Sequence, residues 1–318
     1  MIDGMGIMHS AGEITELGPF DVGQARVAAA RQEYARFERD WDAEFAAVGA
    51  RLEGRACNLT RVVEAVLEWD RPIQQALMSS VTNCVSECRS ALDNTIVAMV
   101  REAGGSDAEI NRASFPLVAS EETWTAAASS RLPVVGDDVR ARVRSLQAWA
   151  PEQRVKGPGR HPLEMLKMFD RHRHQVPLQP ALLTMFPKRT NEVGQLEVTL
   201  TPWEAEKWMK SLTNDDAITD SQDVRYGVVR HGDVVLRTYL PEGTKTFTYT
   251  FPRGVFSVGV IVDGLAVPEP LLHQLKNLMR FTDEAVHYLV GKAEKAPAAW
   301  VFGDVTGVRR HPGVAFGL

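Results

Sequence analysis

Apolar residues recur every three or four positions between Pro72 and Gly104, which is the spacing of one face of an α-helix. A proline is typical of a first helical turn, and the Gly104-Gly105 pair is typical of a helix end. The pattern therefore predicts one long amphipathic helix over residues 72–104. Its expected buried face carries Leu77, Val81, Cys84, Val85, Cys88, Leu92, Ile96, Met99 and Val100.

A second long helix is predicted for residues 21–52. Its apolar positions repeat at a spacing of about 3.5, which favours packing along a partner helix. The pattern does not say whether that partner belongs to the same chain, so the helix can equally form the seam of a homo-oligomer. The repeating positions are Val27, Ala30, Tyr34, Phe37, Trp41, Phe45, Val48 and Leu52.

Shorter patterns predict two more helices in this half of the chain, at residues 137–149 and 163–174. Residues 59–69 are ambiguous between a short helix and a strand, because their apolar run is brief and rich in valine.

Beyond Thr190 the apolar spacing changes to every second residue, which indicates β-strands. His231-Gly232 lies between two such runs and is typical of a hairpin turn. A short helix is expected at 202–211, and a longer one at 269–292 should cover one face of the sheet. The five expected strands are 194–200, 223–230, 233–240, 245–251 and 255–262.

Together these elements predict an α+β fold: an N-terminal helical bundle followed by an antiparallel sheet of about five strands covered by a C-terminal helix. The expected domain organisation is a loosely ordered arm at 1–20, a helical domain at 21–190, the sheet with its helix at 191–293 and a peripheral tail at 294–318.

The composition and net charge exclude some classes of protein but do not assign a function. The net charge of -5 gives no general attraction to nucleic acid or to anionic lipid, so any basic site must be local. Three cysteines are too few for a disulfide framework, and the first residues lack the basic and apolar pattern of a leader. We therefore expect a cytoplasmic protein that neither enters nor spans a membrane. No motif for a phosphate loop, a GxSxG nucleophile or an HExxH metal site occurs, so no cofactor is expected.

Residues 154–189 form a local basic segment, with eight Lys and Arg residues against Glu164 and Asp170. Such a segment can bind RNA or nucleotide phosphate, or it can be a solvated basic face. Within it, the run FDRHRH places Asp170 one helical turn before Arg173 and His174, where it can orient a histidine for acid–base work or close a helix end. The candidate residues here are Lys167, Asp170, Arg171, His172, Arg173 and His174.

Arg89 and Asp93 lie one turn apart beside the apolar face of the central helix, with Asn94 next to them. Cys84 and Cys88 share a helix face and could join two histidines around zinc, but their spacing is not that of a common zinc motif, so no metal is expected.

Several short segments resemble a loosely defined group of uncharacterised bacterial and phage-borne proteins. The segments are ECRSALDNTIVAMV, SFPLVAS, VRSLQAW and HPLEMLKMFDRHRHQVP, and the similarity covers most of residues 70–290 in order. The group shows an LRSALDH helix, an FPI segment, an LQPY helix end and a DKHR segment before a β-rich half. The arginine and histidine of LRSALDH are also spaced as in the HEPN ribonuclease motif of a helical bundle. In this chain Asn94 occupies the histidine position, so the resemblance implies catalysis only if His172 or His174 supplies the proton transfer beside Arg89.

Two functions follow as alternatives. One is a phosphate- or RNA-binding protein with HEPN-like ribonuclease activity, in which Arg89 and the basic segment face one groove. The other is a non-catalytic interaction or structural protein that oligomerises through its helical half, in which the same polar residues only hold helices together.

Overall fold

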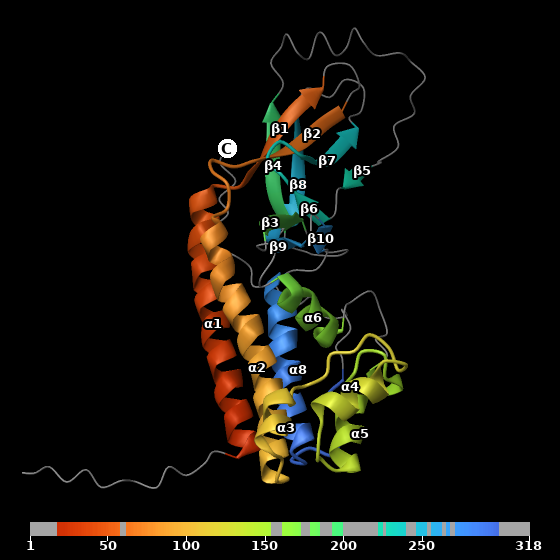
Figure 1. Ribbon diagram of the computed structural model, residues 1–318. Coiled ribbons are helices and arrows are strands. Elements are labelled where there is room, and N and C mark those ends of the chain that lie inside the picture. The colour runs from red at the N-terminus through yellow and green to blue at the C-terminus, as the bar shows by residue number, and fades with distance from the viewer. Residues whose placement is uncertain are drawn as a thin grey trace, which may run out of the picture.

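Three long helices lie side by side as a stem, and the β-strands gather at one end of it (Figure 1). The stem helices are α1 (Pro19–Val48), α2 (Met78–Glu102) and α8 (Leu271–Leu289). The structure is a computed structural model, and it describes residues 18–57, 62–153, 161–172, 179–184, 193–199, 222–224, 227–239, 246–252, 256–262, 265–267 and 271–298.

Four shorter helices flank the stem: α3 (Asp107–Arg112), α4 (Trp124–Arg131), α5 (Asp137–Ser145) and α6 (Pro162–His172). Two single 3-10 turns, η1 (Gln75–Leu77) and η2 (Pro151–Gln153), precede α2 and follow α5. The helices predicted at 137–149 and 163–174 are therefore present. The first ends four residues early, at Ser145.

The strands form three antiparallel ladders in the described part of the chain. One has the order β1-β2-β7-β5, the second β10-β9-β3-β6, and the third pairs β4 with β8. Their bounds are β1 (Arg51–Cys57), β2 (Val62–Glu68), β3 (Gln179–Thr184), β4 (Val193–Thr199), β5 (Gln222–Val224), β6 (Gly227–Val229), β7 (Val234–Tyr239), β8 (Thr246–Pro252), β9 (Phe256–Val262) and β10 (Leu265–Val267).

The predicted fold class is wrong. Helix accounts for 65% of the residues whose side chains are described, and the expected single five-stranded sheet does not form. Two strands come from the N-terminal half: β1 pairs with β2, and β2 pairs with the later strand β7. The C-terminal helix α8 packs mainly along α1 and α2, so it completes the helical stem and does not cover a sheet.

The predicted hairpin at His231-Gly232 is a turn between two different ladders, because β6 pairs with β3 while β7 pairs with β2. Gly232 has a φ of 79°, which a glycine adopts without strain. The turn is fixed on β2: the Gly232 N–H donates to the Leu67 carbonyl at 2.7 Å, and the Leu67 N–H donates to the Asp233 carbonyl at 2.9 Å. Hydrogen bonds to a neighbouring strand therefore replace the pairing that a hairpin would have.

The two long helices are shorter than the apolar pattern predicts. The first ends at Val48 instead of residue 52, because Gly49 takes a left-handed φ of 61° and residues 51–57 enter a strand. Residues 62–68 also form a strand, which resolves the ambiguity of 59–69. The arm expected at 1–20 ends inside α1, since that helix begins at Pro19; residues 1–17, the helix expected at 202–211 and residues 299–318 lie outside the described chain.

Glu44 explains why the central helix does not begin at Pro72. Its carboxylate is 9% exposed and accepts both terminal N–H groups of Arg71, at 2.9 and 2.7 Å, and the Gln74 N–H at 2.6 Å. The hydrogen bonds from Arg71 hold the pKa of Glu44 below its usual value. This clamp keeps residues 71–74 out of the helix, which starts only at Met78 after η1.

Replacing Glu44 by glutamine should lower the free energy of unfolding by about 1–2 kcal/mol, because one charge of the pair is lost while Arg71 remains partly solvated. Urea denaturation at pH 7 measures the loss. The loss should shrink as the pH falls below about 4.5, because the unfolded carboxylate is protonated first and the folded one, whose pKa is lowered, only at a lower pH. The exposed Asp40→Asn on the same helix is the control, with little change expected, and an equal loss in both variants would contradict the assignment.

The core lies between the stem helices and their neighbours. The expected apolar faces of α1 and α2 are turned inward, with Val27, Phe37, Trp41, Val81, Cys84, Leu92 and Ile96 all fully buried. The stripe of α1 thus finds its partners, α2 and α8, within the same chain. Phe115 is also fully buried, and it enters this core from the loop after α3.

Candidate functional site

Arg89 is held in a closed cluster with Asp93 and the backbone of Phe115, named here the Arg89 clasp. The Arg89 Nε–H donates to Asp93 Oδ2 at 2.8 Å, and an Nη2–H donates to the Phe115 carbonyl at 2.9 Å. The Phe115 N–H donates to Asp93 Oδ1 at 2.8 Å, which closes the ring of interactions. The two side chains are 12% and 28% exposed, so the cluster is mostly shielded from water.

The clasp follows from local sequence. Arg89 and Asp93 are one helical turn apart on α2, where side chains of opposite charge meet. The peptide unit of Phe115 reaches them because its ring is fully buried between the helices. The remaining terminal nitrogen of Arg89, Nη1, is covered and makes no hydrogen bond. The arrangement locks the 114–117 loop onto α2, and it leaves no open guanidinium edge on which a phosphate could be held.

The helix that carries the FDRHRH run does pack on the central helix, because α6 contacts both α2 and α8. Its buried side chains are Leu163, Met165, Leu166 and Phe169. Lys167 lies on α6 and is half-buried, as is Asn94 on α2. These two binding candidates therefore lie on helices in contact, while the recorded polar partners of Arg89 are Asp93 and Phe115.

The side chains of the remaining candidate site residues lie outside the part of the chain that the structure describes. Asp170, Arg171 and His172 form the last turn of α6, but their side chains are not described. Arg173 and His174 lie outside the described residues, as do 154–160 and 185–189 of the basic segment. The pairing of Asp170 with Arg173 or His174 therefore stays a prediction.

His161, which the sequence places among the basic residues, is instead buried and neutral. It is 2% exposed, and burial lowers its pKa to about 4. Its Nδ1 accepts the Leu163 N–H at 3.1 Å, and its Nε2 lies 3.2 Å from Gln153 Oε1. The sequence signal that was missed is the His161-Pro162 pair at a helix start, where a side chain must satisfy a free N–H.

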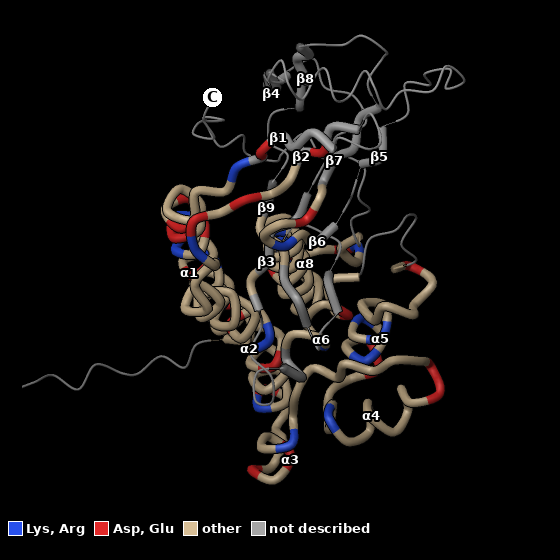
Figure 2. The backbone as a smooth tube through the Cα atoms, turned by 90° about the horizontal axis from the view of Figure 1, so that it is seen from above, with Lys and Arg blue, Asp and Glu red and all other residues tan. Residues whose placement is uncertain are grey.

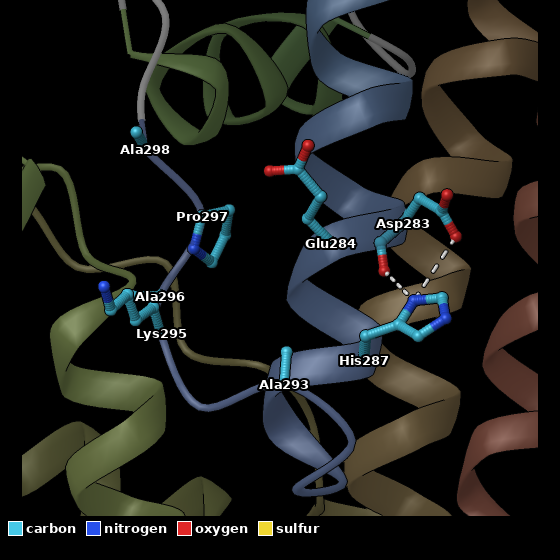
Figure 3. Close-up of a pocket in the computed structure, with 8 residues that line it drawn as sticks. All are labelled: Asp283, Glu284, His287, Ala293, Lys295, Ala296, Pro297 and Ala298. Atoms are coloured by element: carbon cyan, nitrogen blue, oxygen red, sulfur yellow. Dashed lines mark hydrogen bonds and ion pairs between the residues drawn. The ribbon is translucent and has the colours of Figure 1, made fainter.

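A groove of about 390 Å³ lies between α8 and residues 293–298 (Figure 3). Its charged lining residues on α8 already have partners. Asp283 accepts from Gln24 at 2.8 Å and from Arg31 at 2.7 Å, and Glu284 accepts from Arg280 at 3.2 Å. The other lining residues are His287, Ala293, Lys295, Ala296, Pro297 and Ala298.

His287 does not turn this groove into a proton-transfer site. Its Nδ1–H donates to the backbone carbonyl of Asp283 at 2.9 Å, and its ring packs edge-on against Phe20 at 5.0 Å. The ring therefore points along α8 toward α1 and away from residues 293–298 (Figure 3). The sequence pattern predicted no role for the residues of this groove. The one signal that points to it is the spacing of Asp283 and His287, which lie one helical turn apart.

Cys84 and Cys88 are free, buried thiols, and a hydrogen bond between them together with burial raises the pKa of Cys84. Within the described ranges no group of three or more His, Cys, Asp or Glu side chains is arranged to hold a metal ion. Every helix in the described part of the chain is too short or too polar to cross a lipid bilayer.

No protein-family model, curated protein or solved structure matches the chain. The resemblance to the bacterial and phage-borne group, and to the HEPN motif, therefore stays an expectation from the sequence.

Proposed function

We propose that this chain is a non-catalytic interaction protein whose helical stem is a scaffold. The observation that carries the proposal is the Arg89 clasp: the arginine on which a ribonuclease site would depend binds Asp93 and Phe115. A guanidinium stabilises phosphate charge only when its N–H groups face the substrate. Here the Nε–H donates to Asp93, an Nη2–H donates to the Phe115 carbonyl, and Nη1 is covered.

The partner that we propose is a second copy of the chain, bound through the outward face of α1. The inward face of this 30-residue helix is used within the chain, so a homo-oligomer through it needs the opposite face. That face is lined by small side chains, which allow two helices to approach closely. The exposed alanines of α1 are Ala25, Ala28, Ala35, Ala43, Ala46 and Ala47.

The charges along α1 are mixed in sign in both halves of the helix. The first half carries Asp21, Arg26, Arg31 and Glu33, and the second half carries Arg36, Glu38, Arg39, Asp40, Asp42 and Glu44. Figure 2 marks such charged residues along the tube of α1. Arg26 and Arg31 form ion pairs with Glu87 and Asp283 of the same chain, so the proposed contact rests on the small side chains of the outward face and not on charge.

Sedimentation over a range of protein concentrations tests this proposal. The wild-type protein should form a dimer, because the small side chains of the outward face allow two copies of α1 to approach closely. Ala28→Glu and Ala35→Glu should reduce dimerisation at least tenfold without lowering the melting temperature. Ala126→Glu, on an exposed site of α4, is the matched control. A monomer at every concentration, or equal weakening by the control, would contradict the proposal.

Weak phosphate or RNA binding by the basic segment is the second candidate. Its support is that, among the side chains of α6 that the structure describes, only apolar ones are buried, which leaves Lys167 half-buried on a helix beside the stem. Replacing Lys167, Arg171 and Arg173 together by alanine should then abolish binding of a short RNA, and wild-type binding should fall steeply with salt. Cleavage is a separate expectation that needs His172 or His174 and a pH profile near neutrality. If RNA binding is absent or does not depend on salt, only the proposal of a non-catalytic interaction protein remains.

A further inference from the structure

His161 stands at the meeting point of four segments of the chain. Its Nδ1 receives the Leu163 N–H at the start of α6, and its Nε2 faces Gln153 Oε1 in η2. Gln153 in turn donates its side-chain N–H to the Pro297 carbonyl at 2.9 Å, and the imidazole packs edge-on against Phe281 of α8 at 5.1 Å. One side chain thus joins α6, η2, α8 and residues 293–298.

Only one protonation state satisfies this arrangement. Because Nδ1 accepts a backbone N–H, the proton of the neutral ring must lie on Nε2, where it donates to Gln153 Oε1. A second proton, on Nδ1, would face the Leu163 N–H donor and would place a positive charge where the ring is 2% exposed. Protonation is therefore incompatible with the closed arrangement.

No neighbouring charge compensates for this in the described residues. Burial is the cause of the lowered pKa, and the other groups that face the ring are Gln153, Phe281 and the Leu163 backbone. Of the other charged side chains on the packed elements, Glu152, Glu164, Lys276, Glu294 and Lys295 are exposed, Lys167 is half-buried, and Arg280 and Glu284 pair with each other.

We propose that His161 makes an acid-sensitive contact, named here the His161 latch. When its imidazole takes up a proton, the start of α6 and residues 293–298 separate from the stem. Apart from His161, the start of α6 is held by its buried apolar side chains. Residues 293–298 are held by the bond from Gln153, the residue that faces His161, and by a long contact of 3.4 Å from the Arg280 Nη2–H to the Ala298 carbonyl. Release would uncover the apolar side of α6 and the groove beside α8.

The direction and size of the effect follow from proton linkage. A free histidine titrates near pH 6.5 and the buried His161 near pH 4, so the open state binds a proton more readily than the closed state. The latch is at full strength above pH 6.5 and weakens as the pH falls toward 4. The opening equilibrium should rise by up to about tenfold per pH unit in that window, or about 20-fold between pH 7 and pH 5.

Amide hydrogen exchange of the full chain at pH 7 and pH 5, corrected for the intrinsic exchange rates, tests the latch. In the wild-type protein, residues 162–169 and 293–298 should open about 20-fold more often at pH 5, while the middle of α2 should not. His161→Asn keeps an oxygen that can accept the Leu163 N–H but cannot titrate, so its opening should be the same at both values. His287→Asn, which changes a half-buried histidine on α8 that makes no contact with His161, is the control and should retain the wild-type rise.

Three results would overturn the latch: no rise at pH 5 in the wild-type protein, an equal rise in His161→Asn, or an equal rise in the centre of α2, which would indicate global acid unfolding. If the asparagine variant does not fold, the wild-type protein still decides the matter. Carbon-13 labelling of the histidines should then show that His161 takes up its proton together with the opening of residues 293–298, and uptake without opening would contradict the proposal.

Discussion

Replacing Arg89 by alanine should lower the free energy of unfolding by about 2–4 kcal/mol, the largest effect that we expect for one polar side chain of the stem. The variant removes two charge-assisted hydrogen bonds and leaves Asp93 and the Phe115 carbonyl short of donors in a shielded place. Denaturation in urea at pH 7 measures the loss, and the slope of the transition should stay unchanged if only stability is affected.

Further variants distinguish the contribution of the Arg89 charge from that of its hydrogen-bond geometry. Arg89→Lys keeps the charge but cannot donate in the same fork, so it should lose part of the stability. Asp93→Asn keeps an acceptor for the Phe115 N–H, and the double variant should lose less than the sum of the two single losses. Additive losses would show that Arg89 and Asp93 act separately, and a loss below about 0.5 kcal/mol for Arg89→Ala would place that arginine outside any buried network.

Replacing Gly23 by alanine should destabilise the protein by about 1–3 kcal/mol, although alanine is the better helix former by about 1 kcal/mol. Gly23 lies where α1 meets α2 and α8, and an added Cβ would stand 2.8 Å from Val286 and still closer to the hydroxyl of Thr95. Thermal denaturation measures the effect. Thr95→Ala in the same chain should recover part of the loss because it removes one of the two collisions.

Ala29→Gly is the reverse change on the same helix. It measures the effect of helix propensity without a steric collision. Its loss should not exceed about 1 kcal/mol, since Ala29 lies only half-buried. Stabilisation by Gly23→Ala would mean that the three helices are farther apart at this point than the structure has them.

The stem helices could be predicted because the apolar spacing that indicates them depends only on residues close in sequence. Apolar spacing placed both long helices and α8, and the side chains Val81, Leu92 and Ile96 are fully buried as expected. The helix ends were less accurate, because they depend on distant groups. The central helix starts at Met78 because Glu44, 34 residues earlier, holds the peptide between Arg71 and Gln74 in another conformation.

The sheets and the site could not be predicted in the same way. An alternating pattern shows that residues form strands, but it does not choose their partners, so nothing in residues 62–68 indicates pairing with 234–239. Similarly, Arg89 and Asp93 are one turn apart in the sequence, but the Phe115 peptide that closes the clasp is known only from the fold. The same limit applies to His161, whose buried surroundings come from η2 and α8.

The position of α8 sets the order in which this protein can fold during synthesis. The last helix of the described chain lies against the first one, and the hydrogen bond from Gln24 to Asp283 joins residues 259 positions apart. A ribosome therefore produces α1 and α2 long before the helix that covers Val27 and Ala91 exists. Until translation reaches Val286, the nascent hairpin keeps an uncovered apolar side, on which chaperones can act and at which newly made chains can associate.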